Sequence, residues 1–293
     1  MILVTGAAGL SGSIIVRNFA ERQTKARALA RNRLRSPWLG AFPTIEVVEG
    51  DMRRPETLDS ALQGIDRVLM ISSSDPQMVE TQCAFIDVCK RAGVEYVVKL
   101  SGKESGIGFD PQRFRFTRMH KEIERYLEHS GLGWTHLRPS QFMQVYFREL
   151  PTIVAQGAFF LPMENAQLAP VDIEDIAEVA FALLHDGGHM GKSYDMTGPE
   201  ALTMTQVAER ISRAIGKTVR YVDVAPEKKR QILLAAGVPP ESADALDELF
   251  AERRKRPESM VYLDTHEAFG VRPTTFEEFA RRNAAVFRGD VPA

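Results

Sequence analysis

The sequence has few cysteines, little net charge and no long apolar run, and each shortage excludes a class of protein. The only two cysteines, Cys83 and Cys89, have a spacing that fits neither a disulfide framework nor a metal site. A formal net charge of -2 gives no electrostatic case for a nucleic-acid partner. No apolar stretch approaches the roughly 20 residues of a membrane span. The apolar run that opens at Met1 leaves no room for a signal peptide, so we expect a cytoplasmic protein without metal, membrane or nucleic-acid partners.

Strand-like and helix-like patterns alternate through the first half of the chain, which is typical of a parallel sheet covered by helices on both faces. The expected strands lie at residues 1–4, 26–30, 45–49, 67–71, 96–100 and 134–137. Beyond Arg138 the pattern changes. We expect a strand and a helix within 167–185 to rejoin the sheet, and the rest to form a smaller, mostly helical C-terminal lobe.

The first expected turn, VTGAAGLSG, carries glycines three residues apart. In a strand–turn–helix unit, such glycines permit a tight turn, a close backbone approach to a pyrophosphate, and close packing of the helix on the sheet. The pattern predicts an α/β, Rossmann-type doubly wound sheet. Its expected dinucleotide contacts in this turn are Thr5, Gly6, Gly9, Leu10, Ser11 and Gly12. The alternative for the triplet alone is a glycine-rich loop between buried elements.

The ends of the next two strands indicate which dinucleotide binds. Sheets that bind NAD usually carry Asp or Glu after the second strand, whereas this chain has Arg31, followed by Arg35. Guanidinium groups pair with phosphate in a forked geometry, which predicts a site for the 2′-phosphate of NADP(H). Surface arginines that open a helix are the alternative. After the third strand, we expect Asp51 to accept a hydrogen bond from the adenine amino group, with Met52 beside the ring; an ordinary turn is the alternative.

Segments spread along the whole chain carry a family resemblance: VTGAAGLSG, ALARN, EGDM, HKEIERYLEHSG, GWTHLRPSQFM, VDIEDIAEVA and SYDMTGPEALT. The sequence is similar to the NmrA-like atypical short-chain dehydrogenases/reductases, nearest the branch of triphenylmethane dye reductases and NADPH:quinone reductases. The resemblance implies an NADP-binding Rossmann domain at 1–150, to which 166–195 returns, and a smaller substrate-binding lobe at 151–293 that closes over a cleft. It places Pro139 and Ser140 nearest the nicotinamide, with Ser72, Ser73 and Ser101 lining the same channel.

One feature of many short-chain dehydrogenases is missing. Those that act on alcohols and carbonyls use a tyrosine four residues before a lysine as the proton donor or acceptor. Here Thr117 stands four residues before Lys121, and none of the six tyrosines has a lysine four residues later. An alcohol dehydrogenase mechanism is therefore not expected. Hydride transfer to a quinone or a cationic dye gives a stabilised product and needs less proton assistance, so that chemistry survives the loss.

His120 is the candidate catalytic residue. Helical spacing predicts that His120 shares an inward face with Phe116, Ile123 and Leu127, whereas Lys121 and Glu124 diverge from it. The dye and quinone reductases carry a histidine at the matching position, which implies that His120 orients the acceptor or donates a proton, since imidazole titrates near neutral pH. The alternative is a partly buried histidine at the rim of the core.

Aromatic residues are expected to line the acceptor site. Flat rings suit a planar acceptor, and we predict that Phe114, Phe142 and Tyr146 bind it. The alternative is that these rings pack the two lobes together. Lys103 and Glu104, in the segment LSGKES, either reach the acceptor or face solvent.

Two functions stay open at this point. The first is a reductase that transfers hydride from NADPH to a quinone, a dye or a similar conjugated acceptor. The second is a non-catalytic NADP(H)-binding redox sensor of the NmrA type, which would bind another protein. His120 and the aromatic residues favour the enzyme, because a sensor needs neither. We expect a small-molecule acceptor as the partner and leave a homodimer open.

Overall fold

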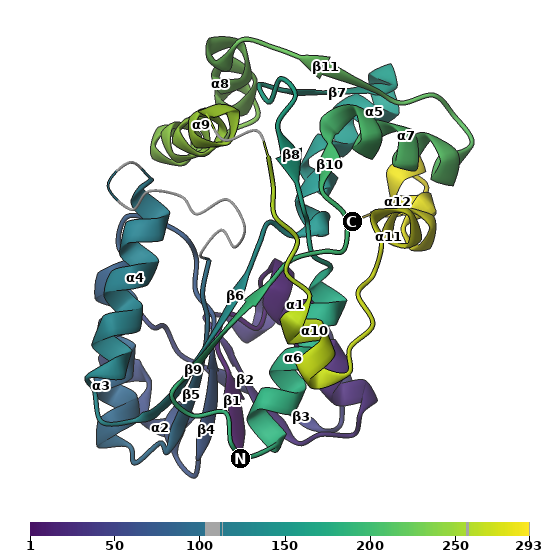
Figure 1. Ribbon diagram of the computed structural model, residues 1–293. Coiled ribbons are helices and arrows are strands. Elements are labelled where there is room, and N and C mark those ends of the chain that lie inside the picture. The colour runs from purple at the N-terminus through teal and green to yellow at the C-terminus, as the bar shows by residue number, and fades with distance from the viewer. Residues whose placement is uncertain (103–111, 113, 256–257, 293) are drawn as a thin grey trace.

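The computed structural model describes residues 1–102, 112, 114–255 and 258–292. Figure 1 shows a sheet covered by helices in its lower half, and a smaller group of helices and short strands above it. Lys103 and Glu104, which were expected either to reach the acceptor or to face solvent, fall outside the described residues.

A seven-stranded parallel sheet forms the larger part of the fold and confirms the predicted α/β, Rossmann-type architecture. Its strands run in the order β3-β2-β1-β4-β5-β6-β9. Their bounds are β1 (Ile2–Val4), β2 (Ala26–Ala30), β3 (Ile45–Glu49), β4 (Arg67–Met70), β5 (Tyr96–Leu100), β6 (Gly133–Pro139) and β9 (Lys192–Met196). The order reverses between β1 and β4, and ligands bind outside the carboxyl ends of parallel strands at such a switch point.

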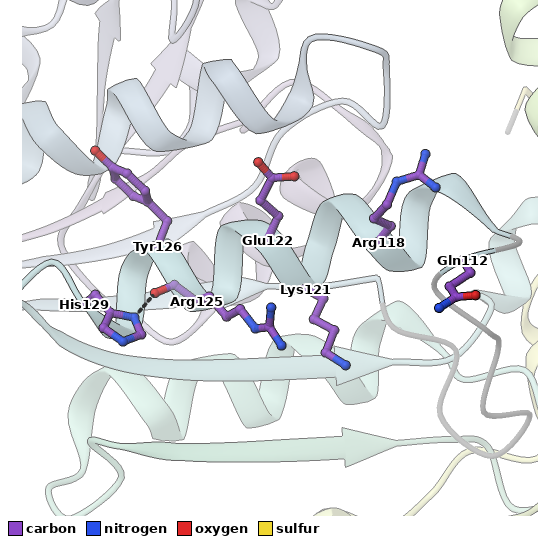
Figure 2. A pocket seen from close by; sticks show the side chains of 7 residues that line it. All are labelled: Gln112, Arg118, Lys121, Glu122, Arg125, Tyr126 and His129. Atoms are coloured by element: carbon purple, nitrogen blue, oxygen red, sulfur yellow. Dashed lines mark hydrogen bonds between the residues drawn. The ribbon is translucent and has the colours of Figure 1, made fainter.

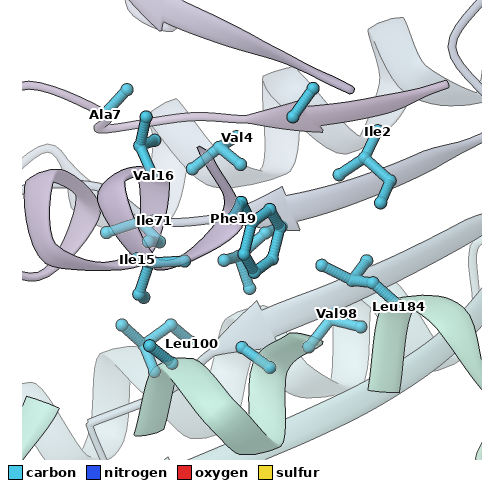
Figure 3. Close-up of a cluster of buried hydrophobic side chains, with 14 of the residues drawn as sticks. Ile2, Val4, Ala7, Ile15, Val16, Phe19, Ile71, Val98, Leu100 and Leu184 are labelled. Carbon is cyan, nitrogen blue, oxygen red and sulfur yellow. The ribbon is translucent and has the colours of Figure 1, made fainter. Parts of the chain in front are cut away.

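Helices cover both faces of this sheet. One face carries α1 (Leu10–Glu21) and α6 (Ile173–His185), and the other carries α3 (Met78–Arg91) and α4 (Arg115–Glu128), with the short α2 (Asp59–Leu62). Figure 3 shows Phe19 of α1 and Leu184 of α6 in the buried cluster against strand residues such as Val98. Burial on both faces explains why these strands read as continuous apolar runs.

The strand that rejoins the sheet after the sixth strand differs from the prediction. We expected it within 167–185, but β8 (Gln167–Leu168) pairs with β10 (Leu202–Thr203) in a separate two-stranded sheet. The seventh strand is β9, which pairs with β6 in parallel. A parallel neighbour needs a crossover connection before it, so the strand follows α6 rather than precedes it.

The smaller lobe has its own hydrophobic core. It is built from α5 (Leu150–Gln156), β7 (Ala158–Leu161), α7 (Met204–Ile215), β11 (Arg220–Asp223), α8 (Pro226–Ala235), α9 (Pro240–Lys255), α11 (Phe276–Arg282) and α12 (Ala284–Arg288). Thr203 and Thr275 begin α7 and α11 with reciprocal capping boxes, which satisfy backbone donors that a helix start leaves free. Buried rings dominate the lobe core, among them Phe159, Phe276, Phe279 and Phe287.

Polar contacts tie the lobe to the sheet domain. Asp172, the N-cap of α6, forms an ion pair with Arg282 of α11. Asp175 accepts hydrogen bonds from the backbone and the hydroxyl of Thr274. The short α10 (Asp264–Phe269) contacts β9 and α6. We propose that the chain divides near residue 150, with 166–195 belonging to the sheet domain.

Across the described ranges, every helix is either too short or too polar to cross a membrane. Within those same ranges, no three His, Cys, Asp or Glu side chains gather as metal ligands would.

Candidate active site at the carboxyl edge of the sheet

The turn between β1 and α1 requires glycine. Gly6 has a φ of +60°, and a Cβ atom there would lie 2.9 Å from the carbonyl oxygen of Ile71. A Cβ atom on Gly12 would lie 2.2 Å from the Gly6 carbonyl oxygen, so any side chain would push α1 away from the turn. At both positions the backbone of the turn packs as closely against its neighbours as the glycine pattern predicts.

The first turn of α1 has free backbone donors. Its N-cap is Gly9, which has no side chain to cap the helix. Ser13 donates its amide hydrogen to the Gly9 carbonyl at 2.9 Å, and the amides of residues 10–12 have no acceptor among the described residues. Leu10 is 44% exposed at this helix start, whereas Ser11 is largely buried. Free N–H groups and the positive end of the helix dipole fit a pyrophosphate group.

Thr5, unlike its neighbours in the turn, holds two strand ends together through its side chain. It is fully buried, and its hydroxyl donates to the Ile71 carbonyl at 2.7 Å and accepts from the Ile71 amide at 2.8 Å. These bonds join the ends of β1 and β4, on the two sides of the switch point. Thr5 therefore fixes the strand ends that carry the glycine turn.

Two exposed arginines follow the second strand. Arg31 follows β2, and Arg35 closes η1 (Arg33–Arg35), which begins where the Asn32 side chain accepts from the Leu34 amide. Both guanidinium groups are exposed, and neither has a hydrogen-bond or ion-pair partner in the described part of the chain. Cations without a counter-ion at this edge fit the 2′-phosphate of NADP(H).

Asp51 and Met52 follow β3 at the same edge. The Asp51 amide donates to the Thr57 hydroxyl at 3.0 Å, and its carboxylate accepts from the Arg53 amide at 3.0 Å. These bonds hold the carboxylate at the strand end. Met52 is only 8% exposed and packs mainly in the core beneath α2.

The predicted serines and Pro139 lie after β4, β5 and β6. Ser72 accepts from the Gln82 side chain at 2.8 Å, and Ser73 is exposed beside it. Pro139 ends β6, and Ser140 donates its amide to the Met196 carbonyl and its hydroxyl to the Ala169 carbonyl. All five predicted residues lie at the carboxyl ends of strands: Ser72, Ser73, Ser101, Pro139 and Ser140.

His120 is buried on the inward face of α4. It is 6% exposed, and its Nδ1 lies 2.8 Å from the Nζ of Lys99 in β5. A Cβ atom on Gly102 would lie 2.4 Å from Nε2, so the other side of the ring rests against the backbone just after β5. The glycine gives the ring room at the carboxyl edge of the sheet.

A polar chain continues from Lys99 across the buried face of α4. The Lys99 Nζ also lies 3.3 Å from the Ser101 hydroxyl, which donates to Glu124 at 2.7 Å. Glu124 in turn accepts two hydrogen bonds from Arg138, at 2.9 and 2.7 Å. The expectation that Glu124 diverges from His120 is wrong. It lies one helical turn after His120 and is 5% exposed, because Ser101 and Arg138 supply its partners on the inward face.

Burial sets the charges of this chain. It lowers the pKa of Lys99 to about 7, although the Glu124 charge acts in the opposite direction. Burial, and then the Lys99 charge, bring the pKa of His120 well below its ordinary value. Burial alone would raise the pKa of Glu124, but its bonds with Arg138 and Ser101 bring it below the ordinary range. His120 is therefore neutral at neutral pH, and the expectation that it titrates there is wrong.

The predicted aromatic residues separate into two environments. Phe114 and Tyr146 are 3% and 1% exposed in the lobe core, where the Tyr146 hydroxyl lies 3.5 Å from the Met204 sulfur. Phe142 is half-buried against the sheet core and pairs with Val171. Burial of Phe114 and Tyr146 is what the packing alternative predicts. Contact with an acceptor stays a prediction for all three rings.

A groove on the outer face of α4 contains none of the predicted site residues. Figure 2 shows its polar side chains along the helix, and His129 bonded to the Arg125 carbonyl at 2.6 Å. Lys121 and Glu122 are exposed in this groove, whereas His120 is buried. The groove is thus separate from the buried chain of Lys99, His120 and Glu124.

The sequence interpretation missed Lys99, Gly102, Glu124 and Arg138. A lysine inside the apolar strand YVVKL was one available signal, because a buried cation needs a partner. The four-residue spacing from His120 to Glu124 was another, since it puts both on one helix face. No comparable sequence signal marks Gly102 or Arg138.

Comparisons with known proteins agree with the sequence resemblance. The NmrA-like family model matches residues 1–280. An NAD(P)H azoreductase from Xenophilus azovorans is 35% identical over 290 residues, which cover 98% of this chain and 99% of that protein.

Two solved structures share the fold. An NADPH-dependent quinone oxidoreductase from Escherichia coli, complexed with NADPH, has a TM-score of 0.83 and 27% identity, covering 96% of this chain and 99% of that one. A triphenylmethane reductase from Citrobacter sp., complexed with NADP(H), has a TM-score of 0.82 at 21% identity, with 97% and 100% covered. The second likeness supports the fold alone.

Proposed function

Because this chain belongs to the NmrA-like family, we propose that it is an NADPH-dependent reductase that transfers hydride to a quinone, a dye or a similar conjugated acceptor. The relatives named as an azoreductase and a quinone oxidoreductase support this class of reaction. The observation that carries the proposal is His120, held against Gly102 at the same sheet edge as the glycine turn. A protein that only sensed the cofactor would not need this buried imidazole.

The residues at the sheet edge fit NADPH. The free amides of residues 10–12 would hold the pyrophosphate, Arg31 and Arg35 the 2′-phosphate, and Asp51 the adenine. The bound cofactor supplies the hydride. Ser72, Ser73, Ser101, Pro139 and Ser140 line the nicotinamide side in this proposal.

The chain's own contribution to the chemistry is orientation and hydrogen bonding. Reduction of a quinone leaves negative charge on an oxygen, and a preorganised donor stabilises such charge. A neutral His120 offers a ring N–H for this role, and the product takes its final proton from solvent. Phe142 would cover the flat acceptor, with Phe114 and Tyr146 packing behind it.

The test is loss of NADPH absorbance with a panel of quinones and azo dyes, together with calorimetric binding of NADP(H). We expect turnover with at least one acceptor and binding of the cofactor. Tight binding without turnover of any acceptor would instead support the non-catalytic sensor, and the protein would then need a protein partner.

A further inference from the structure

We propose that Lys99 is a positioning residue for His120, whose ammonium group holds the imidazole in the tautomer with its proton on Nε2. That proton is then available to the oxygen of the reduced acceptor. The inference rests on the proposed reductase function and deepens it, because it assigns to a buried residue a role that acts through His120.

While Lys99 is charged, the chemistry of its ammonium group fixes the direction of the hydrogen bond. The Lys99 Nζ lies 2.8 Å from the Nδ1 of His120, and an ammonium group can only donate. Nδ1 must therefore accept, and a neutral imidazole keeps its single proton on Nε2. Nε2 is the nitrogen that faces Gly102 at the end of β5. Nε2 therefore lies at the carboxyl edge of the sheet, where we propose that the acceptor binds.

The remaining polar chain holds Lys99 in place. Its Nζ approaches the Ser101 hydroxyl, whose proton goes to Glu124, and Arg138 clamps Glu124 with two bonds. Replacing buried charged groups by apolar ones of similar volume is often neutral or stabilising. Stability alone therefore gives no reason for a lysine near the carboxyl end of an apolar strand.

The state of Lys99 depends on groups from every element packed around it. The titratable groups that act on it come from α3, α4 and β6: Cys83, His120, Glu124, His136 and Arg138. Burial raises the pKa of Cys83 to about 11, so its thiol stays neutral. Glu124 keeps its negative charge, and burial lowers the pKa of Lys99 to about 7. Among these groups, Lys99 is the one whose pKa lies near neutral pH.

Loss of the Lys99 charge allows the His120 imidazole to change tautomer. When Lys99 releases a proton to solvent, its amine nitrogen can accept a hydrogen bond from Nδ1–H. Once the amine accepts this bond, the imidazole proton lies on Nδ1, and Nε2 no longer donates. The proposal therefore predicts that kcat for quinone reduction falls as the pH rises through the pKa of Lys99.

The first experiment compares pH profiles of kcat for the wild type and Lys99→Met with one quinone at saturating NADPH. We expect wild-type kcat to fall about tenfold from pH 6 to pH 9. Lys99→Met is expected to be flat over this range, about 10- to 100-fold below the wild type at pH 6, with an unchanged KM for NADPH. Lys121→Met, on the exposed face of α4, the helix that carries His120, is the matched control and should keep the wild-type profile.

The second experiment needs no turnover. Long-range ¹H–¹⁵N NMR spectra distinguish the protonated from the unprotonated ring nitrogen, and His120→Gln identifies the signals. In the wild type at pH 6 we expect the proton on Nε2, and a move to Nδ1 by pH 9. A proton on Nδ1 at pH 6 overturns the inference, whether or not Lys99→Met folds.

The two proposals fail in different ways. If the wild type turns over quinones and Lys99→Met keeps the wild-type pH profile, the role of Lys99 is wrong and the reductase function stands. If no acceptor is reduced by the wild type, the reductase function is wrong whatever the imidazole tautomer. Lys99→Arg keeps a charge at every pH, so activity that persists at pH 9 in this variant supports the inference.

Discussion

Single residues at the sheet edge show which parts of a site a sequence can predict. Glycine spacing predicted the turn because only glycine fits beside the Gly6 carbonyl. Arg31 was predicted because its position after the second strand is fixed by a regular pattern. Lys99 was missed because its meaning lies in a contact with His120, 21 residues away in sequence. Contacts of this kind depend on how helix and strand pack, which residue spacing alone does not state.

Gly12→Ala tests the packing of the turn. The new Cβ atom would lie 2.2 Å from the Gly6 carbonyl oxygen, so the helix must shift. We expect a loss of about 1–3 kcal/mol in the free energy of unfolding, measured in urea, and at least tenfold weaker NADPH binding. Gly40→Ala is the control, because nothing lies within 4 Å of its added Cβ atom. Wild-type stability in Gly12→Ala would contradict the close approach.

Arg31→Ala tests the choice of cofactor. Its guanidinium group is exposed without a partner in the described chain, and a charge-assisted bond to phosphate contributes about 1.5–3 kcal/mol. We expect NADPH binding to weaken at least tenfold by calorimetry while NADH binding stays nearly unchanged. Arg118→Ala, an exposed arginine on α4, should change neither affinity. Equal affinities of the wild type for NADPH and NADH would refute the phosphate clamp.

Among the elements, α4 carries most of the proposed chemistry. Its inward face was predicted from Ile123 and Leu127, and the structure buries both. Glu124 broke the prediction because a carboxylate in an apolar stripe is expected to face solvent unless a partner is known. The partner, Arg138, belongs to a different element, β6. Apolar periodicity thus locates a helix face, whereas the polar groups on that face are decided by the neighbouring strands.

His120→Ala tests the inward face of α4 as a catalytic surface. We expect quinone reduction to slow by about 10- to 100-fold, because a positioned donor is lost while the cofactor still supplies hydride. NADPH affinity should change little. His129→Ala, at the exposed end of the same helix, is the control. Because truncating a buried side chain can cost stability, the thermal midpoint is measured in parallel. A loss of activity that matches the loss of folded protein would return His120 to a structural role.

At the scale of the whole molecule, the sheet domain and the smaller lobe each have a hydrophobic core, and polar contacts of Asp172 and Asp175 connect the two. Parallel strands deliver the candidate residues to one edge, and the chain passes from that edge into the smaller lobe after β6 and after β9 (Figure 1). The alternation of strands and helices predicted the first core. The lobe was predicted only as mostly helical, because its short strands β7, β8, β10 and β11 pair over long sequence separations and carry little periodic signal.

Asp172→Asn tests how strongly the lobe is held to the sheet domain. Asp172 is fully buried, accepts from Gln144 at 2.7 Å and from the Glu174 amide at 3.1 Å, and pairs with Arg282 of α11. Asparagine can keep the helix cap but presents an amide donor to the guanidinium group. We expect the free energy of unfolding in urea to fall by about 1.5–3 kcal/mol, the size of a hydrogen bond to a charged group.

The matched control for this tie is Arg281→Gln, which removes the exposed partner of Glu277 on α11 itself and leaves the pair of Glu277 with Arg213 of α7 in place. Surface ion pairs are worth about 0–1 kcal/mol, so this variant should unfold almost as the wild type does.

If Asp172 holds the two domains together, its loss should also make the unfolding transition less cooperative. If Asp172→Asn loosens the lobe before the sheet domain unfolds, tryptophan fluorescence and far-ultraviolet circular dichroism of the whole chain should no longer coincide, because both tryptophans, Trp38 and Trp134, belong to the sheet domain in our division of the chain. Coincident curves with wild-type stability would show that the lobe is held by its apolar contacts and not by Asp172.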